Sequence, residues 1–259
     1  YNVLQGYEAG NDLSSGQKNV LTGYQAGYNV TTASNTIAIG EKAIGLGVTT
    51  GQGNMGLGYR TGYNLTSGVH NVFMGYTSGE AQTAGDHNVA IGRGSLDSAT
   101  DCDNAIAIGY NAMGAGNTTG ANNVAIGYLA GNDLTSADSS VLIGKEAGAN
   151  VTTAGGAVAI GSKAMGLGVT TGANNVAIGQ QAGHELTSGE ENLMAGSYSG
   201  HSLQTGSVNV LLGHSAGGNL VTQSGNTFNG YYAGYGVSGT ADNNTMIGKS
   251  AGATKTSGS

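Results

Sequence analysis

The chain repeats one short pattern of apolar and polar positions. Each copy holds three mostly apolar residues in a row followed by a glycine, which we call the anchor, as in the segment NVAIG at 123–127. The fifteen anchors are separated by 17 or 18 residues and are Gly6, Gly23, Gly40, Gly58, Gly75, Gly92, Gly109, Gly127, Gly144, Gly161, Gly179, Gly196, Gly213, Gly230 and Gly248. A fixed short period of this kind is typical of a solenoid, in which each repeat packs on the next.

The three apolar positions predict a short β-strand in each repeat. A helix is disfavoured because glycine recurs at two or more places per repeat, and each glycine costs a helix about 1 kcal/mol relative to alanine. In a strand, successive side chains point to opposite faces, so three apolar neighbours need cover on both faces. We therefore predict an all-β, parallel β-solenoid of about fifteen coils that forms one repetitive domain over residues 1–259.

Other columns of the repeat predict how a coil closes. The third residue after the anchor is always small, and the seventh is often Leu or Val, followed in most copies by Thr or Ser and then Gly. These columns indicate a close packing point and a second apolar contact before a turn. The fourth residue before the anchor is Asn in eleven copies, and stacked Asn side chains can hydrogen-bond from coil to coil.

The middle residue of the apolar triplet predicts an interface. A narrow solenoid has one interior, and we assign the first and third residues of the triplet to it. The middle residue would then face water as a continuous apolar stripe, which marks an interaction surface. We predict that copies of the chain associate side by side through this stripe, as a trimer in preference to a dimer, with these interface residues: Leu21, Phe73, Leu142, Met194, Leu211 and Phe228.

Composition and charge narrow the function classes. The chain has 50 Gly and no Pro, yet 38% hydrophobic residues and only 9% charged residues indicate a folded chain rather than a solvated coil. A net charge of −7 without a run of like charge predicts no nucleic-acid partner, and no apolar run is long enough for this segment to insert into a membrane. Cys102 is the single cysteine, which excludes an intrachain disulfide.

Several copies resemble a known repeat. The segments NTIAIGEKAIGLG (35–47), NAIAIGYNAMGAG (104–116) and GAVAIGSKAMGLG (156–168) resemble the head repeat of trimeric autotransporter adhesins of the YadA-like kind. The segment NNVAIGQQAGHELTSG (174–189) is similar to related repeats of bacteriophage tail-fibre proteins. This resemblance implies a left-handed parallel β-roll, three chains side by side, and a surface-displayed adhesive or receptor-facing rod. The coils of this chain are longer than that head repeat, with extra loop residues in segments such as LTSG and VTTG.

Two columns offer candidate binding residues. Tyr follows the anchor in seven copies, and a ladder of Tyr either packs along the rod or presents stacking surfaces to sugars or proteins. Thr and Ser pairs align in the loops. We select Tyr59, Tyr76, Thr66 and Ser67 as candidate surface contacts.

Metal and catalytic chemistry are not indicated. His70 and His87 occupy equivalent positions in consecutive coils, and so do His184 and His201, so each pair should lie side by side. Two His alone are a poor zinc site, and solvated edge positions explain them better. No paired carboxylate recurs beside a His and no His lies near Cys102 in the sequence, so we expect neither an enzyme nor a cofactor.

These observations favour a structural function. We predict a rod of an extracellular, cell-surface or virion fibre that associates with its own copies along its length and also end to end into filaments. We expect the chain to be a segment of a longer fibre. One alternative is an adhesin or receptor-binding head that recognises a surface glycan or protein. A second alternative is an ice-binding solenoid, in which the threonine columns order water.

Overall fold

The computed structural model describes residues 1–237, 239 and 242–254, and over these residues the chain is an all-β parallel solenoid. The predicted fold class is confirmed. The chain divides into two compact units, Tyr1–Leu129 and Ala130–Ser259, each built from coils that contain one three-residue strand. The single domain, the left-handed coil and the trimer remain predictions. No helix able to cross a membrane occurs among the described residues.

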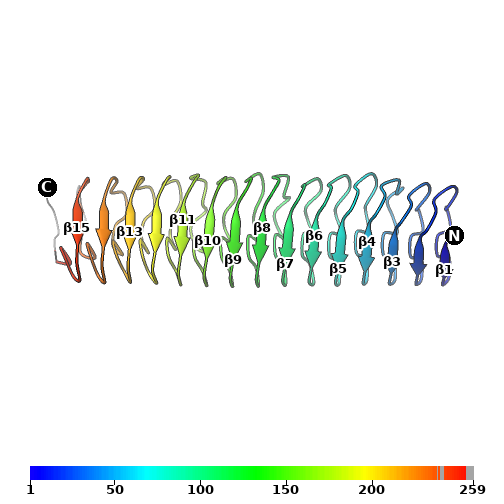
Figure 1. Ribbon diagram of the computed structural model, residues 1–259, viewed down its shortest axis with the longest axis horizontal. Helices are drawn as coiled ribbons and strands as arrows, with labels where there is room; N and C mark the ends of the chain where they lie inside the picture. The colour runs from blue at the N-terminus through cyan, green and yellow to red at the C-terminus, as the bar shows by residue number, and fades with distance from the viewer. Residues whose placement is uncertain (238, 240–241, 255–259) are drawn as a thin grey trace. The chain divides into compact units, whose positions relative to one another are not determined.

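The first unit stacks its strands in chain order (Figure 1). Each strand pairs in parallel with the next and without a register slip, so equivalent positions of neighbouring repeats lie opposite each other, as Val72 and Val89 do. The strands are β1 (Val3–Gln5), β2 (Val20–Thr22), β3 (Ile37–Ile39), β4 (Met55–Leu57), β5 (Val72–Met74), β6 (Val89–Ile91), β7 (Ile106–Ile108) and β8 (Val124–Ile126).

The second unit has the same construction (Figure 1). Its strands also pair in parallel with the next strand of the unit, in the same register. They are β9 (Val141–Ile143), β10 (Val158–Ile160), β11 (Val176–Ile178), β12 (Leu193–Ala195), β13 (Val210–Leu212), β14 (Thr227–Asn229) and β15 (Thr245–Ile247). In both units the strand occupies the three residues before the anchor, where the apolar triplet predicts it.

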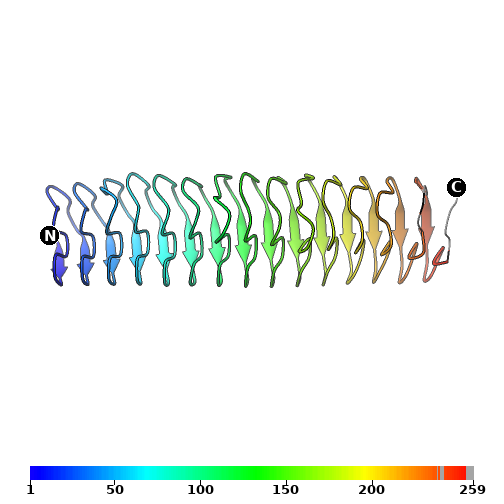
Figure 2. The same ribbon diagram turned by 180° about the vertical axis from the view of Figure 1, so that it is seen from behind.

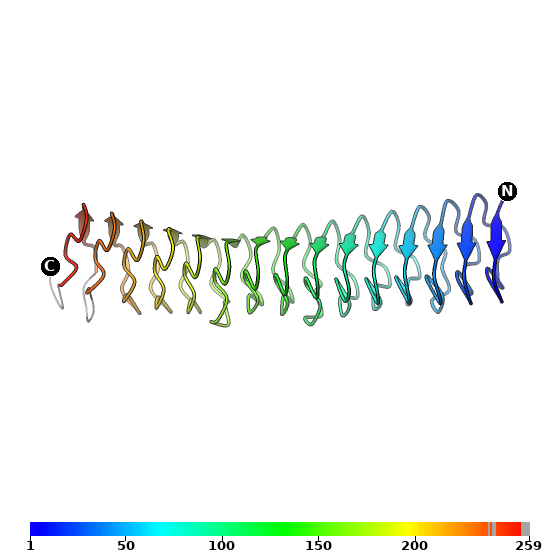
Figure 3. The same ribbon diagram turned by 90° about the horizontal axis from the view of Figure 1, so that it is seen from below.

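Coils are bonded to each other outside the strands as well. Seen from behind and from below, the return segments within each unit follow one another in chain order (Figures 2 and 3). Their backbone groups bond to the next coil, for example from the amide of Gly10 to the carbonyl oxygen of Ala26 at 3.0 Å and from that of Ser14 to Thr31 at 3.0 Å. Each coil therefore satisfies much of its backbone only when a neighbour is present, as expected for a solenoid.

The anchor must be glycine because of its conformation and its surroundings. Gly75 has a φ of +135°, a backbone conformation that residues with a side chain rarely adopt. A Cβ atom added there would lie 2.6 Å from the carbonyl oxygen of Gly92, the anchor of the next coil. The anchor thus ends each strand and allows neighbouring backbones to approach closely.

The interior of a coil is narrow. It contains the middle residue of each triplet, which we call the inner column, together with the small residue three positions after the anchor and the Leu or Val seven positions after it. Phe73, Ala43 and Leu65 represent these three columns, and each is 0% exposed. The predicted close packing point and second apolar contact are confirmed.

Large and small residues compensate each other inside. Where the inner column holds Phe73, the flanking Gly62 and Gly79 leave room, since a Cβ added to either would lie less than 3 Å from the ring. Where it holds only an alanine, as at Ala107, a buried side chain such as Met113 fills the space from four residues after the anchor. This exchange keeps the interior filled at the density expected of a protein core.

The predicted asparagine ladder is confirmed. Asn192 is 1% exposed, and its side-chain oxygen accepts hydrogen bonds from the backbone amide of Asn209 at 3.0 Å and from the side chain of Asn209 at 2.9 Å. The Asn192 amide donates in turn to Asn175 at 2.9 Å and to the carbonyl oxygen of Gly206 at 2.9 Å. Buried polar groups are therefore paired from coil to coil, which fixes the register of the stack.

Candidate functional site

The first and third residues of each triplet form an apolar outer face on the strands. We call these two columns the outer face. In unit 1, Ile39, Leu57 and Ile91 are 37%, 40% and 36% exposed. The other exposed large apolar residues of the outer face are Val3, Ile106, Ile178, Leu193 and Ile247. Because the strands are in register, the outer columns form apolar stripes within each unit, which are interrupted by polar residues at Gln5, Thr22, Thr227, Asn229 and Thr245.

This geometry corrects the predicted interface. Leu21, Phe73, Leu142, Met194, Leu211 and Phe228 are all 0% exposed, so assigning them to a surface stripe is wrong. In a three-residue strand the middle side chain points away from its two neighbours. The rest of the coil closes on the side of the middle residue, so the middle residue is enclosed by its own chain and its two neighbours face outward.

Polar and aromatic residues border the outer face. In most coils, the turn that leads into the strand has a polar residue five positions before the anchor. Examples are Lys18, Asn35 and His87, with φ values of 60°, 58° and 57°. Directly after the anchor, several coils carry an exposed Tyr, as at Tyr24 and Tyr76. An apolar centre with a polar and aromatic border is the usual composition of a protein–protein interface.

The tyrosines after the anchors form a ladder in unit 1. Tyr59 and Tyr76 stack with ring centroids 4.9 Å apart, and Tyr110 and Tyr128 stack at 5.4 Å. Arg93 lies between the two pairs, with its guanidinium carbon 5.5 Å from the Tyr76 ring and 5.7 Å from the Tyr110 ring. Stacking and cation–π contacts thus continue over five consecutive coils. Tyr76 remains 51% exposed, so the ladder packs on itself and also presents surface.

Thr66 and Ser67 lie in the loop that follows Tyr59, seven and eight residues further along the sequence. The hydroxyl of Thr66 donates to the carbonyl oxygen of Thr83 at 2.9 Å, and the hydroxyl of Thr83 donates to the carbonyl oxygen of Thr100 at 3.0 Å. Ser67 is exposed. The threonine column therefore uses its hydroxyl protons to hold coils together, and the candidate contacts divide into a tyrosine ladder and a separate threonine column.

The histidine pairs lie side by side, as their columns predict. Ring centroids are 5.4 Å apart for His70 and His87 and 5.2 Å apart for His184 and His201. Within the described ranges, no three His, Cys, Asp or Glu side chains gather at a point that could hold a metal ion. Cys102 is buried, and burial raises the pKa of its thiol to about 11, so the thiol stays protonated and unreactive at neutral pH.

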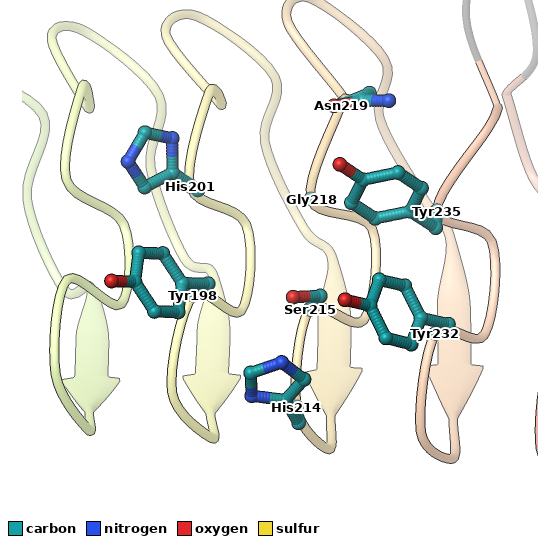
Figure 4. A pocket seen from close by; sticks show the side chains of 8 residues that line it. All are labelled: Tyr198, His201, His214, Ser215, Gly218, Asn219, Tyr232 and Tyr235. Atoms are coloured by element: carbon teal, nitrogen blue, oxygen red, sulfur yellow. The ribbon is translucent and has the colours of Figure 1, made fainter.

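A hollow of about 360 Å³ lies on unit 2 and was not anticipated from the sequence. One of its walls carries Tyr198 and His201, the other carries Tyr232 and Tyr235, and Ser215 and Gly218 lie between them (Figure 4). His214 and Asn219 complete the lining.

The column pattern explains the hollow. Two residues after the anchor, consecutive coils carry Tyr198, Ser215 and Tyr232, and five residues after it they carry His201, Gly218 and Tyr235. One coil with small side chains thus separates two coils with rings. Comparing neighbouring copies in these two columns is the signal that could have located the hollow in advance.

Aromatic contacts hold the lining in place. The His214 ring packs edge-on against Tyr198 at 6.0 Å and against Tyr232 at 5.5 Å. Tyr232 packs edge-on against Tyr235 at 4.9 Å, and Tyr198 lies 5.6 Å from His201. Burial, followed by the neighbouring His184, lowers the pKa of His201, and Glu185 opposes this shift, so His201 is mainly neutral at pH 7.

No family model, no curated protein and no solved structure matches this chain.

Proposed function

We propose that this chain is a structural rod of an extracellular, cell-surface or virion fibre, and that copies of it associate side by side through the outer face. The observation that carries the proposal is the exposure of large apolar side chains, such as Leu57 and Ile91, in columns that are apolar in most coils. Single exposed apolar residues are ordinary on a protein surface, whereas a contiguous stripe of them marks an interaction site.

The length of the apolar stripe indicates that its partner is also extended. Unit 1 has eight strands, and at a strand spacing of about 4.8 Å its outer face extends over roughly 34 Å. A partner has to present apolar side chains at the same spacing to cover it. A second copy of this chain does so with most of its coils, and each of these coils adds a similar contact. Self-association is therefore the simplest way to cover the outer face.

Three copies around a common axis are the arrangement that we favour. Three outer faces turned toward one axis shield each other from water, and closed rotational symmetry is the usual form of a homo-oligomer. The resemblance to trimeric adhesin heads and tail-fibre repeats points to the same number and to display outside the cell. Backbone bonds around each coil and the asparagine ladder supply the rigidity that a fibre needs.

Spin labels test which face joins the copies. We expect light scattering of the unmodified protein to give three times the chain mass of 25.4 kDa. A nitroxide at Ile91→Cys should then show short distances between copies, and one at Leu46→Cys should show longer distances. Leu46 is 52% exposed and lies off the strand, so it is the matched control. Cys102 can remain in place because it is buried.

Two results would contradict the proposal. A protein that remains a 25.4 kDa monomer over the accessible concentration range has no interface to assign. Short distances at Leu46→Cys together with long distances at Ile91→Cys would place the interface on the loop side of the coil.

A further inference from the structure

The hollow on unit 2 has the size and the construction of a small-ligand site. Its volume of about 360 Å³ lies within the usual range of roughly 300–1,000 Å³ for such sites. The coils of the two walls are two steps apart, about 10 Å at a spacing of roughly 4.8 Å per coil. The coil between them carries only Ser215 and Gly218 at the positions where the walls carry rings, so the space there is not filled by side chains.

The lining is preorganised. His214 packs edge-on against one tyrosine from each wall, Tyr198 and Tyr232, and Tyr232 is braced further by Tyr235. Tyrosine loses little conformational entropy on binding because it has only two rotatable side-chain bonds. A lining whose rings already hold each other in place binds a ligand without a large ordering cost.

The chemistry of the lining indicates a neutral ligand with an apolar face and a polar edge. Every side chain that lines the hollow is a Tyr, His, Ser or Asn, and none carries a fixed charge. The aromatic rings offer surfaces for C–H groups, while the phenol hydroxyls, the Ser215 hydroxyl, the imidazoles and the Asn219 amide offer both donors and acceptors. Glu185 interacts electrostatically with His201 but lies outside the lining.

We propose that this hollow binds one pyranose ring of a neutral glycan. The C–H face of the sugar would pack on the tyrosine rings, and its hydroxyls would bond to the polar groups between them. The inference goes beyond the proposed rod function and does not depend on self-association. The hollow is built from residues that follow the anchors, whereas the outer face is built from residues that precede them.

The test is saturation-transfer NMR with a panel of neutral saccharides, namely the methyl glycosides of glucose, galactose, mannose and N-acetylglucosamine. We expect saturation of the tyrosine protons to transfer to the C–H protons of at least one of them. The control ligand is tetramethylammonium, which binds aromatic cages through its charge.

The sharpest variant is Ser215→Tyr. The neighbouring coils carry Tyr198 and Tyr232 at the equivalent position with φ values of 59° and 57°, close to the 53° of Ser215, so the backbone accepts a tyrosine there. The new ring would occupy the gap and weaken saccharide binding at least tenfold. Tyr232→Ala should weaken binding through loss of one wall. Tyr110→Ala removes an exposed, stacked tyrosine of unit 1 and should leave the affinity unchanged.

Three outcomes would overturn the proposal. The first is the absence of transfer to every saccharide of the panel in the unmodified protein. The second is equal transfer in Ser215→Tyr with the circular dichroism spectrum unchanged, which would place the sugar elsewhere. The third is binding of tetramethylammonium alone, which would identify a cation cage. None of these outcomes bears on the oligomer mass, so the two proposals can fail separately.

Discussion

Both faces of most of the short strands are apolar, and they differ in what covers them. In β5, Phe73 is 0% exposed and is enclosed by its own coil and its neighbours, whereas Val72 and Met74 on the opposite face are partly exposed. The inner column therefore stabilises the single chain, and we propose that the outer face joins one chain to another. On this proposal, one apolar triplet contributes both to the folding of the single chain and to the association of copies.

The largest difference between the faces should appear in β5. Phe73→Ala removes a fully buried ring and should lower the free energy of unfolding by about 3–5 kcal/mol. Met74→Ala, one residue further on, should lower the stability of the isolated chain much less and should weaken association instead. Chemical denaturation followed by circular dichroism, with light scattering on the same samples, checks both. Equal losses of stability with no change in mass would erase the distinction between the faces.

The asparagine ladder is the polar counterpart of the inner column. Asn192→Ala leaves the buried amide of Asn209 and the buried carbonyl of Gly206 without their partners, which should lower the free energy of unfolding by about 2–3 kcal/mol. Asn192→Ser should recover part of this loss. Ser140 stands in the same column, where its hydroxyl donates to Ala154 and accepts from Ala157. If the serine variant is no more stable than the alanine variant, the ladder bonds do not account for the effect.

Replacing two buried glutamines with leucine should give the smallest changes in stability, and the two changes should have opposite signs. Gln82 is 0% exposed and its amide donates to the Cys102 sulfur at 3.0 Å, but its side-chain oxygen has no partner. Leu occupies this column in other coils, so Gln82→Leu should stabilise the protein by about 1 kcal/mol.

Gln223 lies ten residues after its anchor, in a column that mostly holds Gly or Ala, and Gln223→Leu should destabilise the protein. The side-chain oxygen of Gln223 accepts from the amide of Val221 at 2.6 Å, and its amide donates to the carbonyl oxygen of Gly239 at 2.7 Å. Thermal denaturation of both variants measures the sign. The same sign for both would show that hydrogen bonding does not decide how a glutamine is tolerated inside the coil.

The fold could be predicted from the sequence because the signals are local and repeated. Strand positions, the small column and the asparagine ladder all follow from residue types that recur at a fixed spacing, and each repetition strengthens the interpretation. Which side of a strand faces the interior could not be predicted in the same way, because an apolar triplet is apolar on both sides.

The size of the residues in each column is the feature that indicates which side of the strand faces the interior. The middle column is rich in Ala, as at Ala38, Ala90 and Ala125, whereas the outer columns are rich in Val and Ile. A coil of 17 residues encloses little space, so the column with the smaller residues belongs inside. The large members of the inner column fit only because glycines such as Gly62 and Gly79 make room for Phe73.

The candidate contacts were harder to predict than the fold. Tyr59 and Tyr76 are stacked on one another, as a ladder predicts. The Thr66 hydroxyl, however, already donates a hydrogen bond to the next coil. The hollow depends on a difference between neighbouring copies, at Ser215 and Gly218, rather than on the shared pattern. In a repeat protein, departures from the consensus are therefore where specific sites should be sought.

The most direct test of the account is the mass of a double variant of the outer face. Leu57→Lys with Ile91→Lys places two charges on the outer face and should reduce the light-scattering mass toward that of the 25.4 kDa chain, with the circular dichroism spectrum unchanged. The matched control is Leu46→Lys with Val48→Lys, at positions 52% and 60% exposed off the strands, and it should keep the assembled mass. An assembled mass for the first variant, or dissociation of the control alone, would contradict an outer face that joins the copies.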